Sequence, residues 1–491
     1  TTDEQAPLVV RCRSRDKVGA SSSFEIGDQT DRMLARLIAS PLFKETPAAL
    51  QSKLTAMLNT TSAAVGRRDA PRRGSGRQSP EYSRRAFEGL ILRAANVVFA
   101  TTNSGEIERL IDERGQFDWS IVEEAGKATG SELLSPLLLS HRRLMIGDHK
   151  QLPPYRSDEM KQLLENPEDV RKVVRIAGDL ISRSLRDPDM EELLDEIEEE
   201  NADLAPLCAD AINTMMLFET LVEREFTRQA GKRPGRPIAR RLETQHRMHP
   251  AIARIVSHCF YEDRLSTDPK REKKFLAEAP PFQSVDPSRL PAEPVVVVNM
   301  PYLQEQIGQR EGDQRPPWRN ASEATAVVNA LALLQVDPAA KKPPTLAVLS
   351  PYARQVTLLD REIEAARSGR LANLNSFQTA TRSGSFCSTV DSFQGSEADV
   401  VVVSLVRNNQ HTSPAKALGF LRDSRRMNVL LSRARWKLVL VGSLRFIETV
   451  REAMTGDDIE KYKFLSKLMH AVETGRRAGE VSVLSPATLG G

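Results

Sequence analysis

Two adjacent acidic residues, Glu123 and Glu124, follow a mainly apolar run from Trp119 to Val122. This pattern predicts a buried strand that brings two carboxylates to the carboxyl edge of a parallel sheet, where α/β proteins bind ligands. One carboxylate there could hold a hydrated Mg²⁺, and the other could take a proton from an attacking water during phosphoryl transfer. A strand followed by a solvated acidic turn fits equally well, so the neighbouring segments must decide.

A second apolar segment, Leu144–Ile146, runs into Gly147 and Asp148 and is followed by Gln151. The carboxamide of Gln151 could reach a nucleotide phosphate or the attacking water. Two polar strand ends within such a short stretch favour a phosphoryl-transfer site over an isolated acidic turn.

Arg247 lies just before a predicted helix that begins at Pro250. Proline suits the first turn of a helix, and a guanidinium group beside a helix start is suited to phosphate oxygens. His246, His249 and Cys259 are possible metal ligands, but their spacing fits no common zinc pattern. We therefore interpret this segment as anion-binding and expect no zinc there.

The composition points to an ordinary soluble protein of two to four domains, since its 491 residues are 40% apolar and 27% charged. The net charge of +3 means that any nucleic-acid-binding surface must be a local patch. The four cysteines form no Cys-x-x-Cys pair, which favours a reducing compartment over a disulfide framework. No apolar run approaches the ~18 residues of a membrane span, so we expect no membrane association.

The chain begins with neither a methionine nor a signal peptide, so we expect a piece of a longer protein. The predicted location is cytoplasmic, with a nuclear one left open.

The first half of the chain is expected to hold three parts. Residues 1–90 form an accessory segment with a Pro/Gly/Ser-rich stretch, residues 66–85, that carries seven arginines. We interpret this stretch as a solvated loop; a basic finger that touches nucleic-acid phosphates is the alternative. Residues 91–155 form the C-terminal part of a first α/β domain. Residues 156–240 form a helical, acidic insertion that could bind protein partners.

Residues 241–475 are expected to form a second α/β domain, in which apolar strand patterns alternate with helices. An arginine-rich helix is predicted over residues 425–435, and a loose tail over residues 476–491. The overall expectation is an α/β fold with parallel sheets and helical insertions.

Six blocks, read in order between Ala95 and Ser443, resemble the motifs of the superfamily-one helicases. The resemblance is to the branch that contains the nonsense-mediated-decay RNA helicase and the Okazaki-fragment nuclease-helicase. Each block is weak alone, but six in this order make a specific signal. The blocks are Val122–Ala125, Gly147–Pro154, Gln245–Pro250, Ser350–Tyr352, Val390–Glu397 and Asn428–Arg435.

The resemblance implies two RecA-like domains, with ATP in the cleft between them and single-stranded DNA or RNA across their top. By position in the motifs, Glu123 would hold Mg²⁺, Glu124 would activate the attacking water, and Gln151 would sense the γ-phosphate. Arg247 and Arg433 would reach that phosphate from the second domain and stabilise the transferred phosphoryl group.

The remaining roles implied by the resemblance concern the ribose and the nucleic-acid strand. Glu397 would contact the ribose of the nucleotide. Hydroxyl-bearing residues would make sequence-independent contacts with the strand: Thr101, Thr102, Ser350, Tyr352, Thr389 and Ser392.

Two departures from the family pattern stand out. Glu123 replaces the usual Asp, which lengthens the arm that would hold the metal. No Gly-x-x-x-x-Gly-Lys-Ser/Thr phosphate loop occurs; Gly126-Lys127-Ala128 lacks both the preceding glycine and the hydroxyl. We therefore expect the chain to start after that loop and to hydrolyse ATP poorly, or not at all, by itself.

Two hypotheses follow from the motifs. The leading one is an ATP-dependent helicase or translocase motor that moves on single-stranded DNA or RNA. The other is a nucleic-acid-binding or scaffold module whose ATPase site is degenerate, as the missing phosphate loop suggests.

Overall fold

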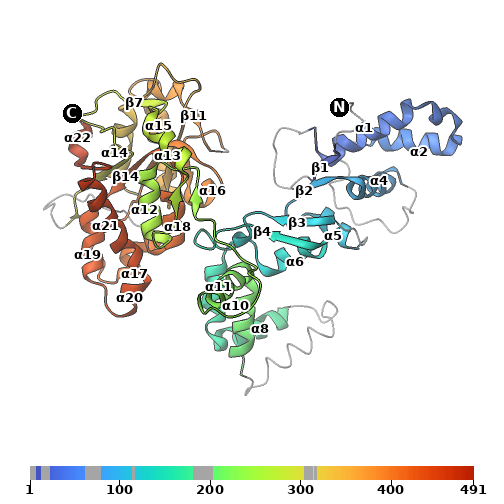
Figure 1. The fold of residues 1–491 in the computed structure, drawn as a ribbon, viewed down its shortest axis with the longest axis horizontal. Helices are drawn as coiled ribbons and strands as arrows, with labels where there is room; N and C mark the ends of the chain where they lie inside the picture. Colours follow the sequence, from blue (N-terminus) through green and yellow to red (C-terminus); the bar gives the residue numbers. More distant parts are fainter. Residues whose placement is uncertain are drawn as a thin grey trace. The chain divides into compact units, whose positions relative to one another are not determined.

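The computed structural model describes residues 7–12, 23–60, 79–112, 117–180, 203–303, 313, 318–381 and 383–490. The chain divides into two compact units, each of which is described by itself (Figure 1). The first unit contains Thr1–Asp148 and Pro153–Arg224, and the second contains His149–Leu152 and Glu225–Gly491. In the ranges that the structure describes, no helix is both long and apolar enough to cross a membrane.

The first unit contains two separate pairs of parallel strands. β1 (Val9–Arg11) pairs with β2 (Val97–Phe99), and β3 (Phe117–Val122) pairs with β4 (Ser140–Met145). The helices around them are α1 (Ile26–Ala39), η2 (Pro41–Glu45), α2 (Ala48–Asn59), α4 (Pro80–Ala94), α5 (Gly105–Asp112), η3 (Ala125–Lys127) and α6 (Gly130–Leu138). The strands predicted near Val97, Val122 and Met145 are thus present.

The prediction that β3 is buried is wrong for most of the strand. Val122 is buried, but Trp119 and Ile121 are 53% and 59% exposed, and Leu144 of β4 is 43% exposed. β3 pairs only with β4 among the described residues, and the exposed Trp119 and Ile121, two residues apart, lie on the same face of the strand. An apolar pattern indicates that a strand tends to be buried, but it does not show whether another element packs against it.

One arginine of the predicted basic loop belongs to the core instead. Arg84 lies in α4 and is fully buried, with its Nη1 2.6 Å from a carboxylate oxygen of Asp31 and its Nε 3.4 Å from Glu88. Its guanidinium group also donates to the carbonyls of Gly27 and Met57. This arginine holds α1, α2 and α4 together and is unavailable to nucleic acid. Residues 61–78, with the other arginines except Arg85, lie outside the described residues.

The predicted insertion is mainly helical where it is described, and its last ten residues, 231–240, form turns and irregular chain. Its helices are α7 (Ser157–Leu164), α8 (Pro167–Leu180), α10 (Ala205–Met215) and α11 (Leu217–Ala230). The acidic run from Asp187 lies outside the described residues, apart from Asp203.

The second unit is built on a seven-stranded sheet in which every recorded strand pair is parallel. The strand order is β11-β10-β13-β14-β8-β15, and β12 also pairs with β10. The strands are β8 (Val295–Asn299), β10 (Thr345–Ser350), β11 (Gln378–Thr379), β12 (Cys387–Thr389), β13 (Ala398–Ser404), β14 (Ala434–Gly442) and β15 (Val481–Leu484).

Helices cover both faces of this sheet, so alternate residues of each strand enter two different cores. Val400 and Val402 pack with α14 (Ala321–Ala332) and α15 (Ala353–Ala366), whereas Val401 and Val403 pack with α12 (Pro250–Phe260) and α21 (Lys463–Arg477). A strand buried on both sides must be apolar at every position, which explains the continuous valine runs. The α/β prediction is therefore confirmed.

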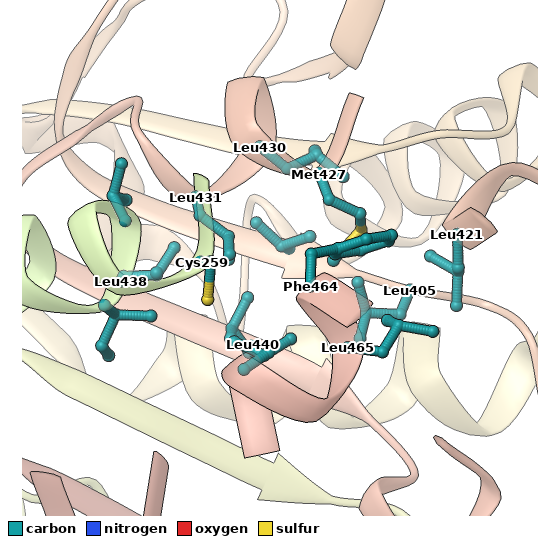
Figure 2. Close-up of a cluster of buried hydrophobic side chains, with 14 of the residues drawn as sticks. Cys259, Leu405, Leu421, Met427, Leu430, Leu431, Leu438, Leu440, Phe464 and Leu465 are labelled. Atoms are coloured by element: carbon teal, nitrogen blue, oxygen red, sulfur yellow. The ribbon is translucent and has the colours of Figure 1, made fainter. Parts of the chain in front are cut away.

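The core on the α12 side also fixes α18 (Ser424–Leu431), as Figure 2 shows. Met427, Leu430 and Leu431 of α18 lie in one cluster with Cys259 of α12 and Phe464 of α21.

Other elements of the unit are α13 (Pro269–Ala277), α16 (Val390–Phe393), α17 (Pro414–Leu418), η7 (Gly419–Arg422), η6 (Ala372–Ser376), α19 (Leu444–Glu452), α20 (Asp457–Lys461), and the short strands β5 (Thr244–Gln245), β6 (Ser266–Thr267), β7 (Phe282–Ser284) and β9 (Leu334–Val336).

The prediction of a loose tail after residue 475 is wrong. Val481–Leu484 forms β15, which pairs in parallel with β8, and α22 (Pro486–Gly490) buries Leu489 completely in the core beside α14. Gly, Ser and Ala suggested disorder, but the alternating Val481 and Val483 supply a strand, and the sheet supplies its pairing partner.

Substituting Leu489 with alanine tests this packing. We expect the free energy of unfolding of the second unit to fall by about 2–5 kcal/mol, because a fully buried leucine is truncated. Urea unfolding followed by circular dichroism measures the change. The matched control is Thr488→Ala, which alters the exposed neighbour; equal effects of the two substitutions would show that the tail is not packed.

Candidate functional site

The two acidic residues of the first unit stand just beyond the end of β3. The β3–β4 ladder continues to this point, since Ile146 N–H donates to Val122 O over 2.8 Å and Ala125 N–H donates to Ile146 O over 2.9 Å. Glu123 and Glu124 are both exposed. Glu124 has φ 54°, a left-handed conformation that is uncommon for a residue with a side chain. Both carboxylates are therefore accessible at a carboxyl strand edge, as predicted from the sequence.

The neighbouring turn after β4 approaches the acidic turn closely. A Cβ added at Gly147 would lie 2.9 Å from the backbone nitrogen of Gly126 and 3.0 Å from the ring of Phe218. Only glycine fits this approach without a shift of the backbone. The close contact holds the end of β4 against the turn that carries Glu124.

Thr101 and Thr102 follow β2 in the same unit. Thr101 is exposed and Thr102 is half-buried, and the carbonyl of Thr101 accepts a hydrogen bond of 3.0 Å from Ser104 N–H. The turn is fixed while both threonines keep some contact with solvent.

In the second unit, Gln151 and Arg433 are hydrogen-bonded. Arg433 is only 2% exposed, and its Nη2 donates to Oε1 of Gln151 over 3.0 Å. The same guanidinium group donates to the hydroxyl of Ser432 and the carbonyl of Val429. These three acceptors are oxygen atoms of a carboxamide, a hydroxyl and a carbonyl, and they orient the guanidinium group.

The segment that carries Gln151 is anchored in the second unit by its neighbours. Leu152 lies in the core on the α12 side. The carboxamide of Asn428 donates to the carbonyl of Lys150 over 2.9 Å and to the hydroxyl of Tyr261 over 2.8 Å. This short segment therefore groups with the second unit, although the sequence pattern assigned it to the first domain.

The prediction of one arginine-rich helix over residues 425–435 is wrong at its end. α18 stops at Leu431, and β14 begins at Ala434, so Arg433 lies in the connecting turn and Arg435 lies in the strand. The pairing of Ala398 with Ala434 brings together the residues that precede the two strands, since Ala398 N–H donates to Arg433 O over 3.1 Å. Register thus places Glu397 close to Arg433.

Arg247 completes this cluster. Its Nε lies 2.6 Å from a carboxylate oxygen of Glu397, and its Nη1 donates to the carbonyl of Ser432 over 3.4 Å. Gln245 accepts from the backbone N–H of Arg247 and so orients the segment. Because both side chains of the Arg247–Glu397 pair are more than a third exposed, the ion pair contributes only about 0–1 kcal/mol to stability. We interpret it as positioning rather than stabilising.

Sequence reasoning missed three members of the cluster. Arg435 lies 3.8 Å from Glu397 and 3.7 Å from Asp399, while Ser432 and Gln245 contact the two predicted arginines. All three lie inside the matched motif blocks or directly beside them. Their position in those blocks was the available signal.

The residues predicted to face nucleic acid in the second unit lie at or beyond the carboxyl ends of their strands. Ser350 ends β10 and Thr389 ends β12, and the two are paired in register. Ser392 is exposed and Thr389 is half-buried; the Thr389 hydroxyl caps α16 by accepting from Ser392 N–H. Glu397 and Arg433, by contrast, precede their strands.

Two of these predicted contacts are buried. Ser350 has no exposed surface, and Tyr352 is 4% exposed, with its hydroxyl accepting from Phe420 N–H over 3.1 Å. Burial raises the pKa of Tyr352. Neither hydroxyl is accessible to a strand in this conformation.

Two family models, each described as an AAA domain, match residues 11–156 and 215–445. The chain is 27% identical over 369 residues to a regulator of nonsense transcripts 1 from Dictyostelium discoideum, which covers 74% of this chain and 21% of the relative. It is 25% identical over 389 residues to an uncharacterized ATP-dependent helicase from Methanocaldococcus jannaschii, covering 77% of this chain and 44% of the relative.

A third similar protein is the DNA-binding protein SMUBP-2 from Rattus norvegicus, 26% identical over 355 residues, which cover 71% of this chain and 27% of the relative. The chain belongs to the superfamily-one helicases, in the group that includes the regulators of nonsense transcripts. It spans less than half of the length of the relatives named here.

His249 and Cys259 have structural roles in the third motif block and the helix that begins in it. Nδ1 of His249 accepts from Ala251 N–H over 3.2 Å and caps α12. Burial lowers the pKa of His249 to about 4, so the ring is neutral at pH 7 and can accept. Cys259 is buried in the core, and burial raises the pKa of its thiol to about 12.

A buried carboxyl group, Glu323, supports the carboxyl edge of the seven-stranded sheet. Glu323 lies in the first turn of α14, a helix that Asn320 caps. Glu323 is fully buried, and one of its oxygens accepts from the hydroxyl of Ser404 over 2.6 Å and from Val406 N–H over 2.8 Å. These bonds hold Val406 at φ 72°, which is a strained conformation for a β-branched residue.

Glu323→Gln tests the protonation of this group. Burial, aided by the negative charge of Asp313, raises the pKa of Glu323 from 4.5 to about 8. The folded state therefore holds a proton that the unfolded state loses above pH 4.5, so this contribution to stability is full below pH 4.5 and disappears as the pH rises through 8.

We expect the free energy of unfolding of the wild type, measured in urea, to fall between pH 5 and pH 8 relative to that of the Gln variant. Because glutamine stays neutral, the variant lacks this dependence. Parallel pH profiles for the two proteins would mean that Glu323 is ionised in the fold.

Proposed function

We propose that this chain is the larger part of an ATP-dependent helicase or translocase motor that works on single-stranded nucleic acid. The observation that carries the proposal is the arrangement of Gln151 and buried Arg433 beside the Arg247–Glu397 pair. Arginines oriented before the reaction stabilise the charge that spreads over a transferred phosphoryl group, and they need no reorganisation during the reaction.

The first unit supplies the carboxylates in this proposal. Glu123 would hold Mg²⁺, which neutralises charge on the phosphates when it is bound. Two accessible carboxylates at a strand end suit a hydrated ion of this kind, because Mg²⁺ prefers oxygen ligands and retains several waters. Glu124 would accept the proton of the attacking water, for which its exposed carboxylate is suited.

The second unit supplies the anion-binding groups. Arg433 would contact the γ-phosphate, with Gln151 held in place by its hydrogen bond to that arginine. Arg247 would contact the same phosphate, and Glu397 would accept from the ribose. The exposed Arg247–Glu397 pair can exchange partners at little cost when a nucleotide binds.

Contacts with the nucleic-acid strand belong to residues with accessible hydroxyl groups: Thr101 and Thr102 of the first unit, and Thr389 and Ser392 of the second. For Ser350 and Tyr352 we propose a different role from the sequence prediction. Because both are buried, they position the turn after β10 and the backbone of Phe420 instead of touching the strand.

A second candidate function is a nucleic-acid-binding or scaffold module without ATP turnover. It is favoured by one observation, the absence of a Gly-x-x-x-x-Gly-Lys-Ser/Thr pattern from these residues. Without the backbone cradle and lysine of such a loop, the β- and γ-phosphates lose their main ligands. On either hypothesis, we propose that these 491 residues alone turn over ATP slowly or not at all.

Glu124→Gln, made in the longest natural form of the protein, tests the motor. We expect ATP turnover to be abolished while nucleotide binding is largely kept, since glutamine preserves the shape but cannot accept the proton. Phosphate release and binding of a fluorescent ATP analogue measure the two. The control is Glu108→Gln, on the exposed surface of α5. Unchanged turnover in the Glu124 variant would contradict the assignment, and absence of turnover in the wild type would favour the scaffold.

Arg433→Lys tests the second unit in the same protein. Lysine keeps the positive charge but loses the planar, multidentate fork, so we expect kcat for ATP to fall by about 10³-fold with the fold retained. The control is Arg477→Lys on α21, an exposed arginine in the same unit. Equal kcat values for wild type and Arg433→Lys would remove Arg433 from the mechanism.

A further inference from the structure

Three arginines outside the helicase motif blocks line one cavity of the second unit. The cavity has a volume of about 130 Å³ and is bounded by Arg319, Arg354, Thr357, Leu358 and Arg361. All three arginines and Thr357 are exposed. A cavity of this size is suited to one small anion rather than to a nucleotide.

A buried clamp brings two of the arginines together. The carboxamide of Gln355 accepts from Asn320 N–H over 2.8 Å and donates to Asn320 O over 3.0 Å, and both residues are buried. Arg319 directly precedes Asn320, and Arg354 directly precedes Gln355. Their proximity is therefore built into the core and does not depend on the conformations of long side chains.

Helix geometry adds the third arginine. Arg354, Thr357 and Arg361 are spaced by three and four residues along α15, so they share one face of that helix. The seven steps from Arg354 to Arg361 correspond to about 10 Å of helix. The cationic face therefore extends along α15 from its first turn.

The charges at this cavity suit an anion. In the described part of the chain, Arg354 makes no hydrogen bond or ion pair, and Arg361 pairs only with its exposed neighbour Glu362, over 2.8 Å. The helices α14 and α15, of 12 and 14 residues, both begin beside the cavity, and their amino ends add partial positive charge. The guanidinium groups offer the N–H donors that a phosphate group accepts, while the Thr357 hydroxyl already donates to the carbonyl of Ala353 over 3.1 Å.

We infer that the pocket formed by Arg319, Arg354, Thr357 and Arg361 binds a backbone phosphate of the single-stranded nucleic acid on which the motor works. This inference rests on the proposed function. It extends the contact surface from the motif hydroxyls along the outer face of α15.

The position of the pocket favours a strand phosphate over a free one. α15 begins at Ala353, three residues after Ser350, and Ser350 is paired in register with Thr389. The first turn of α15, which carries Arg354, therefore follows the same carboxyl edge of the sheet as the hydroxyls of Thr389 and Ser392. We expect a strand that contacts those hydroxyls to continue past Arg354.

The test is equilibrium binding of the 491-residue chain to a fluorescent oligo(dT) and an oligo(U) of equal length, followed by anisotropy at several salt concentrations. We expect Arg354→Ala to weaken binding about tenfold, since a charge-assisted hydrogen bond is lost. The slope of log affinity against log salt should become shallower by about 0.7 for each phosphate contact removed. Arg354→Lys should restore much of the affinity because it restores the charge.

The matched control is Arg477→Ala, which removes one exposed arginine from α21 on the opposite face of the sheet. We expect no change in affinity or slope. Melting temperatures of all variants check the fold, and Arg361→Ala supplies a second variant should Arg354→Ala be unstable.

Binding of inorganic phosphate, measured by calorimetry on the same variants, separates the two sources of the anion. A loss of phosphate affinity with unchanged oligonucleotide affinity would overturn the strand contact and leave a free-phosphate site. Unchanged affinity for both ligands would overturn the pocket altogether. If the wild type itself binds no oligonucleotide, the proposed function fails first, and the strand contact fails with it.

Discussion

The register between β13 and β14 is the constraint on which the candidate site of the second unit depends. Ala398 faces Ala434, so the residues just before them, Glu397 and Arg433, lie close together, and the register shifts once before Val400 pairs with Lys437. Because both strands are buried on both faces, a slip of one residue would move every valine into the opposite core and would separate this pair. The apolar residues of the strands therefore determine the positions of Glu397 and Arg433, which lie just outside the strands.

The same sheet keeps two kinds of chemistry apart. Groups suited to phosphoryl transfer precede β13 and β14, whereas the accessible hydroxyls and the arginine pocket lie where β10 and β12 end. Buried polar groups stabilise each edge: Arg433 is surrounded by oxygen acceptors at one, and Glu323 fixes the backbone after β13 at the other. An unsatisfied group at either place would cost more than its hydrogen bonds return, so both edges are rigid.

The sequence predicted the α/β class, the central strands β8, β10, β13 and β14 of the second unit and the start of α12, because doubly buried strands and helix caps leave local signals. It did not predict that α18 stops before Arg433, because two arginines flanking a strand start look like a continuing helix. It also missed Glu323, whose burial depends on Ser404 and Val406 from a distant strand. The tail was misread because β15 is defined by its partner β8, and pairing over such a separation leaves no local pattern.

The place of β8 in the sheet has a consequence for biosynthesis. It is the first of the seven strands to be made, yet its two neighbours, β14 and β15, are the last. During synthesis on the ribosome, Val295–Val298 therefore has neither of its partner strands until nearly the whole unit has emerged. Such a run of valines is prone to intermolecular pairing, so the newly made chain depends on chaperones or on rapid covering of its faces by α12 and α14.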